Sequence, residues 1–200
     1  MAGDWALEQI ENSKQLAEEI GRVWGDIGNA CRSCSHPDCL GYIPVLEEEE
    51  LNLLEAGCDV IQVNGDHGPR FLDSYFRDEQ GRLIVTQSKP QCPYRDAHSG
   101  RCTVHAHRPL ACHLYPLGHE VTEGGEAIWA LHTDCAYVES AIANHRLDHL
   151  VAQLGAVLDR MSPGLQQHLG AHYANVETVT KRADGPSSYI VVRSMERSYD

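Results

Sequence analysis

The stretch that decides how this chain folds runs from Cys92 to Pro116 and reads CPYRDAHSGRCTVHAHRPLACHLYP. Cysteines recur in it at ten-residue steps, at Cys92, Cys102 and Cys112, with proline, glycine and histidine between them. Proline and glycine interrupt regular structure, so the sequence predicts irregular backbone here. Irregular backbone in a small core needs something to hold it, and a cysteine-bound metal is the usual solution.

A second cysteine group precedes this stretch, in the segment CRSCSHPDC from Cys31 to Cys39. The C-x2-C pair of Cys31 and Cys34 suits a metal, because two thiolates can hold one ion while N–H groups of the turn donate to their sulfurs. Cys39 adds a third sulfur in the same loop. Cys135 follows later, just before an expected helix, whose N-terminus would lower the pKa of the thiol and favour ligation.

Seven of the eight cysteines therefore stand in loop contexts and are our candidate metal ligands: Cys31, Cys34, Cys39, Cys92, Cys102, Cys112 and Cys135. Seven thiols exceed one four-sulfur site, so the sequence is compatible with two centres or with spare cysteines. The eighth cysteine, Cys58, precedes the apolar Val60 and Ile61. Cysteine is among the most buried residue types even without chemistry, so we interpret Cys58 as a packed thiol whose replacement should keep the metal.

One arginine and several histidines beside the cysteines are candidates for binding or supporting the centre. Arg108 can hydrogen-bond a carboxylate or balance the charge of a thiolate-bound centre. His113 and His132 lead the nearby histidines, either as ligands or as hydrogen-bonded neighbours of ligands. Two further pairs are spaced i,i+4 on expected helices without an H-E-x-x-H pattern, so we favour a solvated or partly packed face for both: His145/His149 and His168/His172.

The motif C-x2-C-x4-C, followed by C-P-Y and G-x-C-x-V-H-x-x-R-P-x-x-C-x-x-Y-P, resembles the YkgJ-type cysteine cluster family, described as a zinc- or iron-chelating domain. The resemblance covers about residues 31–135 and is most specific from Gly100 to Pro116. It implies a cysteine-bound metal centre, and members are often labelled iron–sulfur proteins or oxidoreductases without a defined substrate. The chain departs from the family at Leu40, often a cysteine there, and at His113, usually an arginine.

Thiolate ligands alone do not choose between zinc and an iron–sulfur cluster. Structural zinc prefers two close cysteine pairs such as C-x2-C, and here only Cys31 and Cys34 form such a pair. Iron–sulfur clusters tolerate scattered ligands, and Cys92-Pro93 is similar to the Cys-Pro of some ferredoxin loops. We therefore expect an iron–sulfur centre with a redox or electron-transfer role. A zinc-stabilised non-catalytic interaction module and an iron-dependent modifying enzyme remain alternatives, so enzymatic activity stays open.

Composition excludes several classes of partner. The chain has 16 Lys and Arg against 29 Asp and Glu, a formal charge of -13, which argues against a grip on nucleic-acid phosphates and against docking to an anionic membrane. The N-terminus lacks a basic start and an apolar run, so we expect no signal peptide and a cytoplasmic protein with reduced thiols. A protein redox partner or protein substrate is compatible with these features.

The fold class that we expect is α+β, with a small irregular cysteine-rich metal-binding core, flanking helices and short hairpins. We divide the chain into four parts: an N-terminal helix (1–28), the cysteine-cluster core (29–136), C-terminal helices packed on that core (137–176) and a tail (177–200) in which 189–192 is alternatively an edge strand.

The predicted elements are a helix over 4–27 capped by Asp4, a short helix over 47–56, hairpins over 70–86 and 119–132, and helices over 136–161 and from 163 to about 175. We interpret the acidic run 47–50 as a helix start rather than a ligand cluster, because acidic side chains suit the positive end of a helix.

Overall fold

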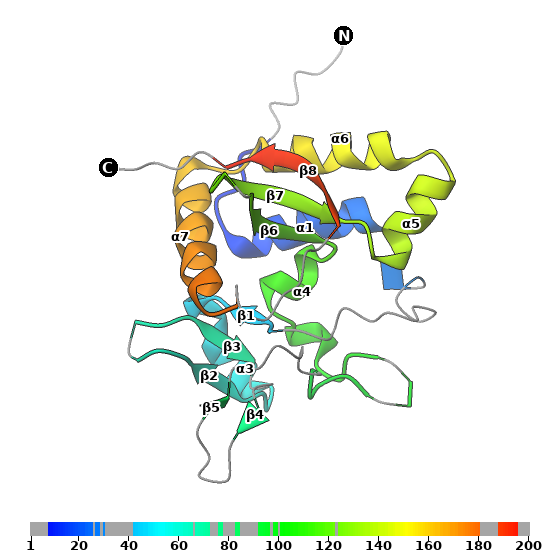
Figure 1. The fold of residues 1–200 in the computed structure, drawn as a ribbon. Coiled ribbons are helices and arrows are strands. Elements are labelled where there is room, and N and C mark those ends of the chain that lie inside the picture. Colours follow the sequence, from blue (N-terminus) through cyan, green and yellow to red (C-terminus); the bar gives the residue numbers. More distant parts are fainter. Residues whose placement is uncertain are drawn as a thin grey trace.

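The computed structural model of this chain describes residues 8–25, 27–28, 30, 42–65, 67–72, 76–77, 83–84, 92–96, 98–99, 101–122, 124–180 and 188–195. The fold is mixed α+β, as the sequence predicts, with small antiparallel sheets and flanking helices (Figure 1). The first cysteine group, Cys31 to Cys39, lies outside the described residues. No helix within the described ranges is long and apolar enough to cross a membrane.

A three-stranded sheet and five helices surround the larger of the hydrophobic clusters, here named the large cluster. Its strands pair antiparallel in the order β6-β7-β8: β6 (Leu117–Val121), β7 (Ala127–His132) and β8 (Tyr189–Ser194). Its helices are α1 (Ser13–Trp24), α4 (Leu110–Leu114), α5 (Ala136–Ala143), α6 (Leu147–Leu158) and α7 (Pro163–Thr180). The central strand β7 is buried from residue 127 to residue 131, because the sheet is covered by helices.

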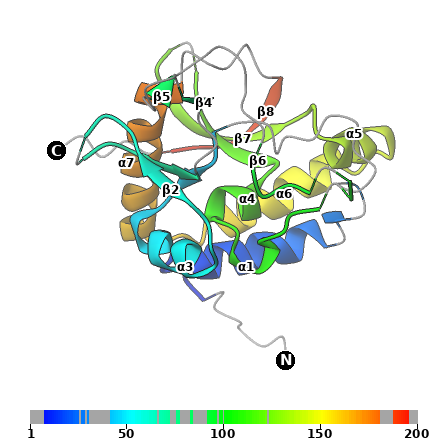
Figure 2. The ribbon, with the colours of Figure 1, turned by 90° about the horizontal axis from the view of Figure 1, so that it is seen from below.

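A second sheet and a short helix carry the small cluster, whose buried members are Ile43, Val45, Leu53, Cys58, Leu72 and Cys92. The strands lie in the antiparallel order β1-β3-β2: β1 (Pro44–Val45), β2 (Val60–Gln62) and β3 (Arg70–Leu72). The 3-10 turn η1 (Glu47–Glu49) leads into α3 (Glu50–Glu55), which lies beside the start of α1 (Figure 2). A two-stranded hairpin, β4 (Phe76–Arg77) with β5 (Leu83–Ile84), follows, and η2 (His105–His107) precedes α4.

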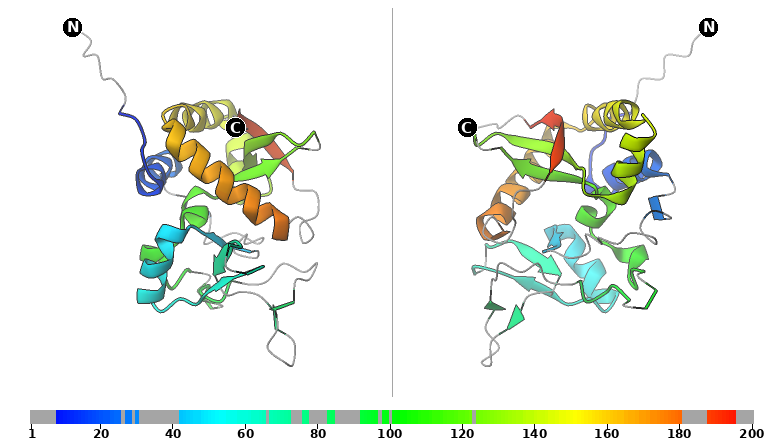
Figure 3. Two further views of the ribbon diagram at one scale, coloured as in Figure 1. Left: turned by 90° about the vertical axis from the view of Figure 1, so that its left-hand side faces the viewer. Right: turned by 45° about the vertical axis from the view of Figure 1, so that its right-hand side comes forward.

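Helix α7 packs against both sheets. It begins beside α6 and runs toward the smaller sheet (Figures 1 and 3). Leu165, Leu169 and Tyr173 on its first turns pack in the large cluster. One turn further, Val176 packs with Val63 and Phe71 of the smaller sheet. The helix therefore buries one end in each half of the molecule.

Three predicted elements are confirmed. The acidic run 47–50 begins a helix, and the hairpin over 119–132 forms as β6 and β7 with a turn at Gly125, whose φ of 81° suits glycine. The strand alternative for the tail is also the one that forms, because β8 pairs with β7 along Ile128 to His132. The hairpin over 70–86 is split, since 70–72 pairs with β1 and β2 and only 76–84 folds back on itself.

The predicted start of the first helix is wrong. Helix α1 begins at Ser13, and Asn12 caps it by accepting a hydrogen bond from the Gln15 N–H at 3.0 Å. The chain before it is extended, and Ile10 pairs with the segment after α6, where its N–H donates to the Arg160 carbonyl at 2.8 Å. Tertiary pairing of Ile10, which is buried, replaces the helical turns expected from the apolar spacing.

The long helix predicted over 136–161 is two helices. α5 ends at Ala143, His145 has a φ of 55°, and α6 begins at Leu147. The Asn144 side chain donates to the Ser140 carbonyl at 2.7 Å and so competes with continuation of the helix. Ile142, predicted on the buried face, is 43% exposed, since the break turns α5 away from the axis of α6.

A buried carboxylate joins the two halves. Glu49 in η1 accepts hydrogen bonds from the N–H of Leu46, at 3.0 Å, and from the N–H of Leu110 at the start of α4, at 2.6 Å. Burial raises the pKa of the Glu49 carboxyl to about 7, against the lowering effect of these two donors. One member of the acidic run therefore caps two segments that are sixty residues apart in the sequence.

Glu49 should make stability fall with increasing pH. The folded state keeps the Glu49 proton up to a pKa of about 7, whereas the unfolded chain releases it near 4.5. The free energy of unfolding should therefore drop by about 1 to 3 kcal/mol as the pH rises between these values. Glu49→Gln cannot titrate, so urea unfolding across this range should show a weaker pH dependence in the variant. Parallel pH profiles of the two proteins would contradict this assignment.

Candidate metal centre

The segment from Cys92 to Cys112 folds back on itself, which brings its widely spaced cysteines together. Arg95 and Cys102 form an isolated antiparallel bridge, and the Thr103 N–H donates to the Tyr94 carbonyl at 2.8 Å. After η2, the chain enters α4, in which Cys112 packs against the small cluster. Successive cysteines of this segment are ten residues apart. The chain from Cys92 to Cys102 is irregular, and the chain from Cys102 to Cys112 passes through η2 into α4.

Three cysteines meet at the small cluster, and one of them, Cys58, is the residue that the sequence assigned to packing. Cys58 and Cys92 are buried members of the cluster, at 2% and 7% exposure, and the half-buried Cys112 packs against them. Burial, followed by the proximity of Cys102 and Cys92, raises the pKa of the Cys58 thiol. Burial also raises the pKa of Cys92, with Cys102 again contributing. These thiols are close enough to oppose one another's ionisation.

The turn after Cys92 places backbone N–H groups near its side chain. The Arg95 N–H donates to the Cys92 carbonyl at 3.2 Å, and the backbone N–H groups of Tyr94 and Arg95 lower the pKa of the Cys92 thiol against the effect of its burial. A metal-bound thiolate commonly accepts hydrogen bonds from backbone N–H groups, because its remaining lone pairs need partners. The surroundings of Cys92 are therefore chemically suited to a thiolate that binds a metal. Among the described residues no three Cys, His, Asp or Glu side chains complete such a site by themselves.

Cys135 and His132 lie in a different part of the molecule from Cys92. Cys135 is the N-cap residue of α5 and is buried in the large cluster. His132, at the end of β7, stacks on Tyr115 with ring centroids 6.0 Å apart, and its Nε2 lies 3.3 Å from a carboxylate oxygen of Glu120. Both predicted site residues therefore pack against the larger sheet, away from the small cluster.

Arg108 and His113 form a pair at the edge of α4. The Arg108 Nε–H donates to His113 Nδ1 at 3.2 Å, and the Trp24 indole donates to the His113 carbonyl at 3.2 Å. Burial, with Arg108 nearby, lowers the pKa of His113 to about 4, so the ring is neutral at pH 7. A neutral ring that accepts at Nδ1 carries its proton on Nε2. His113 in this arrangement offers no lone pair to a metal.

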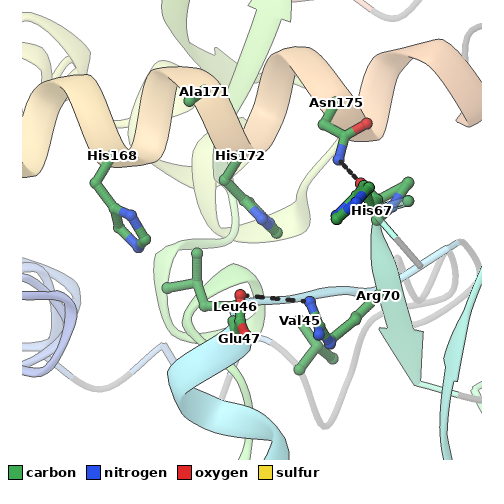
Figure 4. A pocket seen from close by; sticks show the side chains of 11 residues that line it. Val45, Leu46, Glu47, His67, Arg70, His168, Ala171, His172 and Asn175 are labelled. Atoms are coloured by element: carbon green, nitrogen blue, oxygen red, sulfur yellow. Dashed lines mark hydrogen bonds and ion pairs between the residues drawn. The ribbon is translucent and has the colours of Figure 1, made fainter.

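A polar cleft of about 500 Å³ separates α7 from the smaller sheet (Figure 4). His168 and His172 reach into it from α7, and Arg70 faces them from β3. His168 Nε2 lies 3.2 Å from a carboxylate oxygen of Glu48, and Arg70 Nε donates to Glu50 at 2.9 Å. The i,i+4 spacing was the one sequence signal for this site. The other such pair, His145/His149, is divided by the break between α5 and α6 and is exposed.

The structure thus unites part of the predicted ligand set with one cysteine that sequence reasoning set apart. Cys92, Cys102 and Cys112 gather with Cys58, whereas Cys135 lies in the other cluster. The remaining predicted ligands are outside the described residues: Cys31, Cys34 and Cys39. No family model, curated protein or solved structure matches this chain.

His172 should make stability fall at low pH. Burial, with His168 nearby, lowers the pKa of His172 from 6.5 to about 4. Between pH 6.5 and pH 4, the unfolded chain therefore binds a proton at His172 and the folded state does not. The free energy of unfolding should therefore fall by about 1 to 3 kcal/mol as the pH drops through this range. His172→Phe should reduce that loss in urea unfolding, and His149→Phe on the exposed face of α6 is the matched control. An unchanged acid profile in His172→Phe would contradict the burial of this ring.

Proposed function

We propose that this protein is a metalloprotein in which cysteine thiolates hold an iron–sulfur centre with a redox or electron-transfer role. The observation that carries the proposal is the position of Cys58, Cys92 and Cys112 at one apolar cluster, with Cys102 near enough to raise the pKa of the Cys58 and Cys92 thiols. A cluster of reduced thiols has no strong attraction of its own, and each thiolate is costly to bury unpaired. A bound cationic centre converts the same arrangement into a stabilising one.

The polar groups around Cys92 support a thiolate-bound centre further. N–H donors to cysteine sulfur are among the means by which proteins set the reduction potential of iron–sulfur clusters. The backbone N–H groups of Tyr94 and Arg95 lower the pKa of the Cys92 thiol against the effect of its burial. The apolar side chains around it, such as Leu53 and Leu72, keep water from the centre and thereby also affect its potential.

The first cysteine group can reach the same centre. Ile43 is buried in the small cluster, four residues after Cys39. At roughly 3.3 Å per extended residue, the chain places Cys39 within about 13 Å of Ile43. We therefore include Cys31, Cys34 and Cys39 as proposed ligands. The resemblance to the YkgJ-type family, which couples these two cysteine groups, supports the same combination.

Zinc is the alternative occupant, and one observation favours it. The turn at Cys92 places backbone N–H groups near a thiol buried in an apolar environment, which also suits a closed structural zinc site. In that case the centre stabilises the fold, and the protein acts as a non-catalytic interaction module. An iron-dependent modifying enzyme would require an open coordination position in addition.

Elemental analysis and absorption spectra of anaerobically purified protein test the proposal. We expect iron and sulfide in stoichiometric amounts, with a broad absorption at roughly 400 nm that dithionite bleaches. Cys92→Ser and Cys112→Ser should lose the metal and destabilise the fold together, because metal binding and folding are linked. Cys135→Ser, a buried thiol in the large cluster, is the matched control and should retain the metal.

The outcomes separate the two metals. Colourless protein with stoichiometric zinc would overturn the iron–sulfur assignment and favour the structural module. Protein that binds neither metal under reducing conditions, while remaining folded, would overturn the metalloprotein proposal altogether. Loss of metal from Cys135→Ser, equal to that from Cys92→Ser, would contradict the choice of ligands.

A further inference from the structure

We infer that the outward face of helix α3 docks a basic amphipathic segment of a partner protein. Four large apolar side chains are exposed among the described residues, and two of them lie on this short helix: Leu51 at 67% and Leu54 at 48% exposure. The other two, Ile142 and Val191, belong to separate elements, α5 and β8. A single exposed apolar side chain is common on soluble proteins, whereas two adjacent ones form a patch that a partner can cover.

The helical period of α3 directs the two leucines away from the protein core. Leu51 and Leu54 are three positions apart, so they are neighbours on the surface of the helix. Leu53 lies on the opposite side, where it is completely buried in the small cluster at 0% exposure. The core contact of α3 is therefore made by Leu53, and the exposed pair does not contribute to it.

The helix that carries this face is held in place on both sides. Asn52 Oδ1 lies 3.2 Å from His107 Nδ1 of η2. At the other end Gly57, with a φ of 79°, reverses the chain, and the Cys58 N–H donates to the Leu53 carbonyl at 2.9 Å. Figure 2 places α3 at the rim of the molecule, beside the start of α1. A surface fixed in this way binds a partner with little loss of its own conformational freedom.

Exposed carboxylates lie at both ends of the leucine pair: Glu47, Glu48, Glu55 and Asp59. Two of them have partners inside the molecule, since Glu47 lies 3.7 Å from Arg70 and Glu48 lies 3.2 Å from the His168 ring. Arg70 is closer to Glu50, at 2.9 Å, so it offsets only part of the charge. The border of the apolar pair is consequently acidic.

The charge of this border selects the partner. A segment in which lysine or arginine stands beside apolar side chains complements leucines that lie between carboxylates, and such complementarity determines which partners associate. A second copy of this chain would bring the same carboxylates against one another across a two-fold interface, and juxtaposed like charges oppose association. Nucleic-acid phosphates and an anionic membrane are repelled for the same reason.

Binding of a synthetic amphipathic helix of leucine and lysine to the full chain tests the inference. Fluorescence anisotropy of the labelled peptide should show binding that weakens with added salt, and a counterpart of leucine and glutamate should not bind. Leu51→Asn/Leu54→Asn should bind roughly tenfold or more weakly, because the apolar centre of the contact is lost. Ile142→Asn changes a side chain of comparable exposure, 43%, and should bind as wild type does.

Two further measurements separate docking on α3 from general attraction to an acidic chain. Glu47→Gln/Glu55→Gln should weaken binding and its salt dependence, whereas Glu126→Gln/Glu139→Gln removes the same charge from other exposed positions and should have less effect. Hydrogen exchange of the wild-type protein should show that the peptide protects residues 47–55. This footprint needs no variant, so it decides the location even where a substitution impairs folding.

Equal binding of the peptide by wild type and by Leu51→Asn/Leu54→Asn would overturn the inference, as would the absence of binding or of protection at 47–55. Self-association of the wild-type protein in sedimentation, abolished by Leu51→Asn/Leu54→Asn, would assign the face to a second copy instead. None of these measurements depends on the metal content of the protein. Failure of this inference therefore leaves the proposed function intact, and failure of the proposed function leaves this inference intact.

Discussion

The small cluster combines hydrophobic packing with buried thiols. Its buried members within the described residues are six, and two of them are Cys58 and Cys92. The strands of its sheet are only two or three residues long, so the sheet depends on the side chains that pack against it. A centre bound by the thiols is the interaction that we propose to add to this packing.

The larger part of the molecule supplies the remaining support. Glu49 ties η1 to the start of α4 by accepting two N–H groups, and Val176 of α7 packs on Phe71 of the smaller sheet. The cleft beneath α7 adds an ion pair between Arg70 and Glu50 and a contact between the His168 ring and the Glu48 carboxylate. The thiol group is thus held on a frame whose own core, around β7, is extensive and closely packed.

Several features of the site followed from the sequence and others did not. The loop position of Cys92 and Cys102 was predicted correctly, because proline and glycine at short spacing leave little choice of local structure, whereas Cys112 lies in helix α4 and not in a loop. The packing of Cys58 was predicted correctly from its apolar neighbours Val60 and Ile61, since the thiol is buried at 2% exposure in the small cluster. Nothing in the local sequence of Tyr94 indicated that its hydroxyl would accept the N–H of Asp59 from a different segment.

The sequence by itself determined the α+β class, the hairpin at Gly125, the helix start at the acidic run and the loops that carry cysteine, because each depends on local backbone preferences. Only the tertiary structure decided that Cys58 lies with Cys92, that Cys135 lies apart, and that Ile10 pairs with Met161 instead of extending α1. The physical reason is the same in each case. Burial and pairing between distant segments outweigh a local preference worth less than 1 kcal/mol per residue, and spacing along the chain carries no information about them.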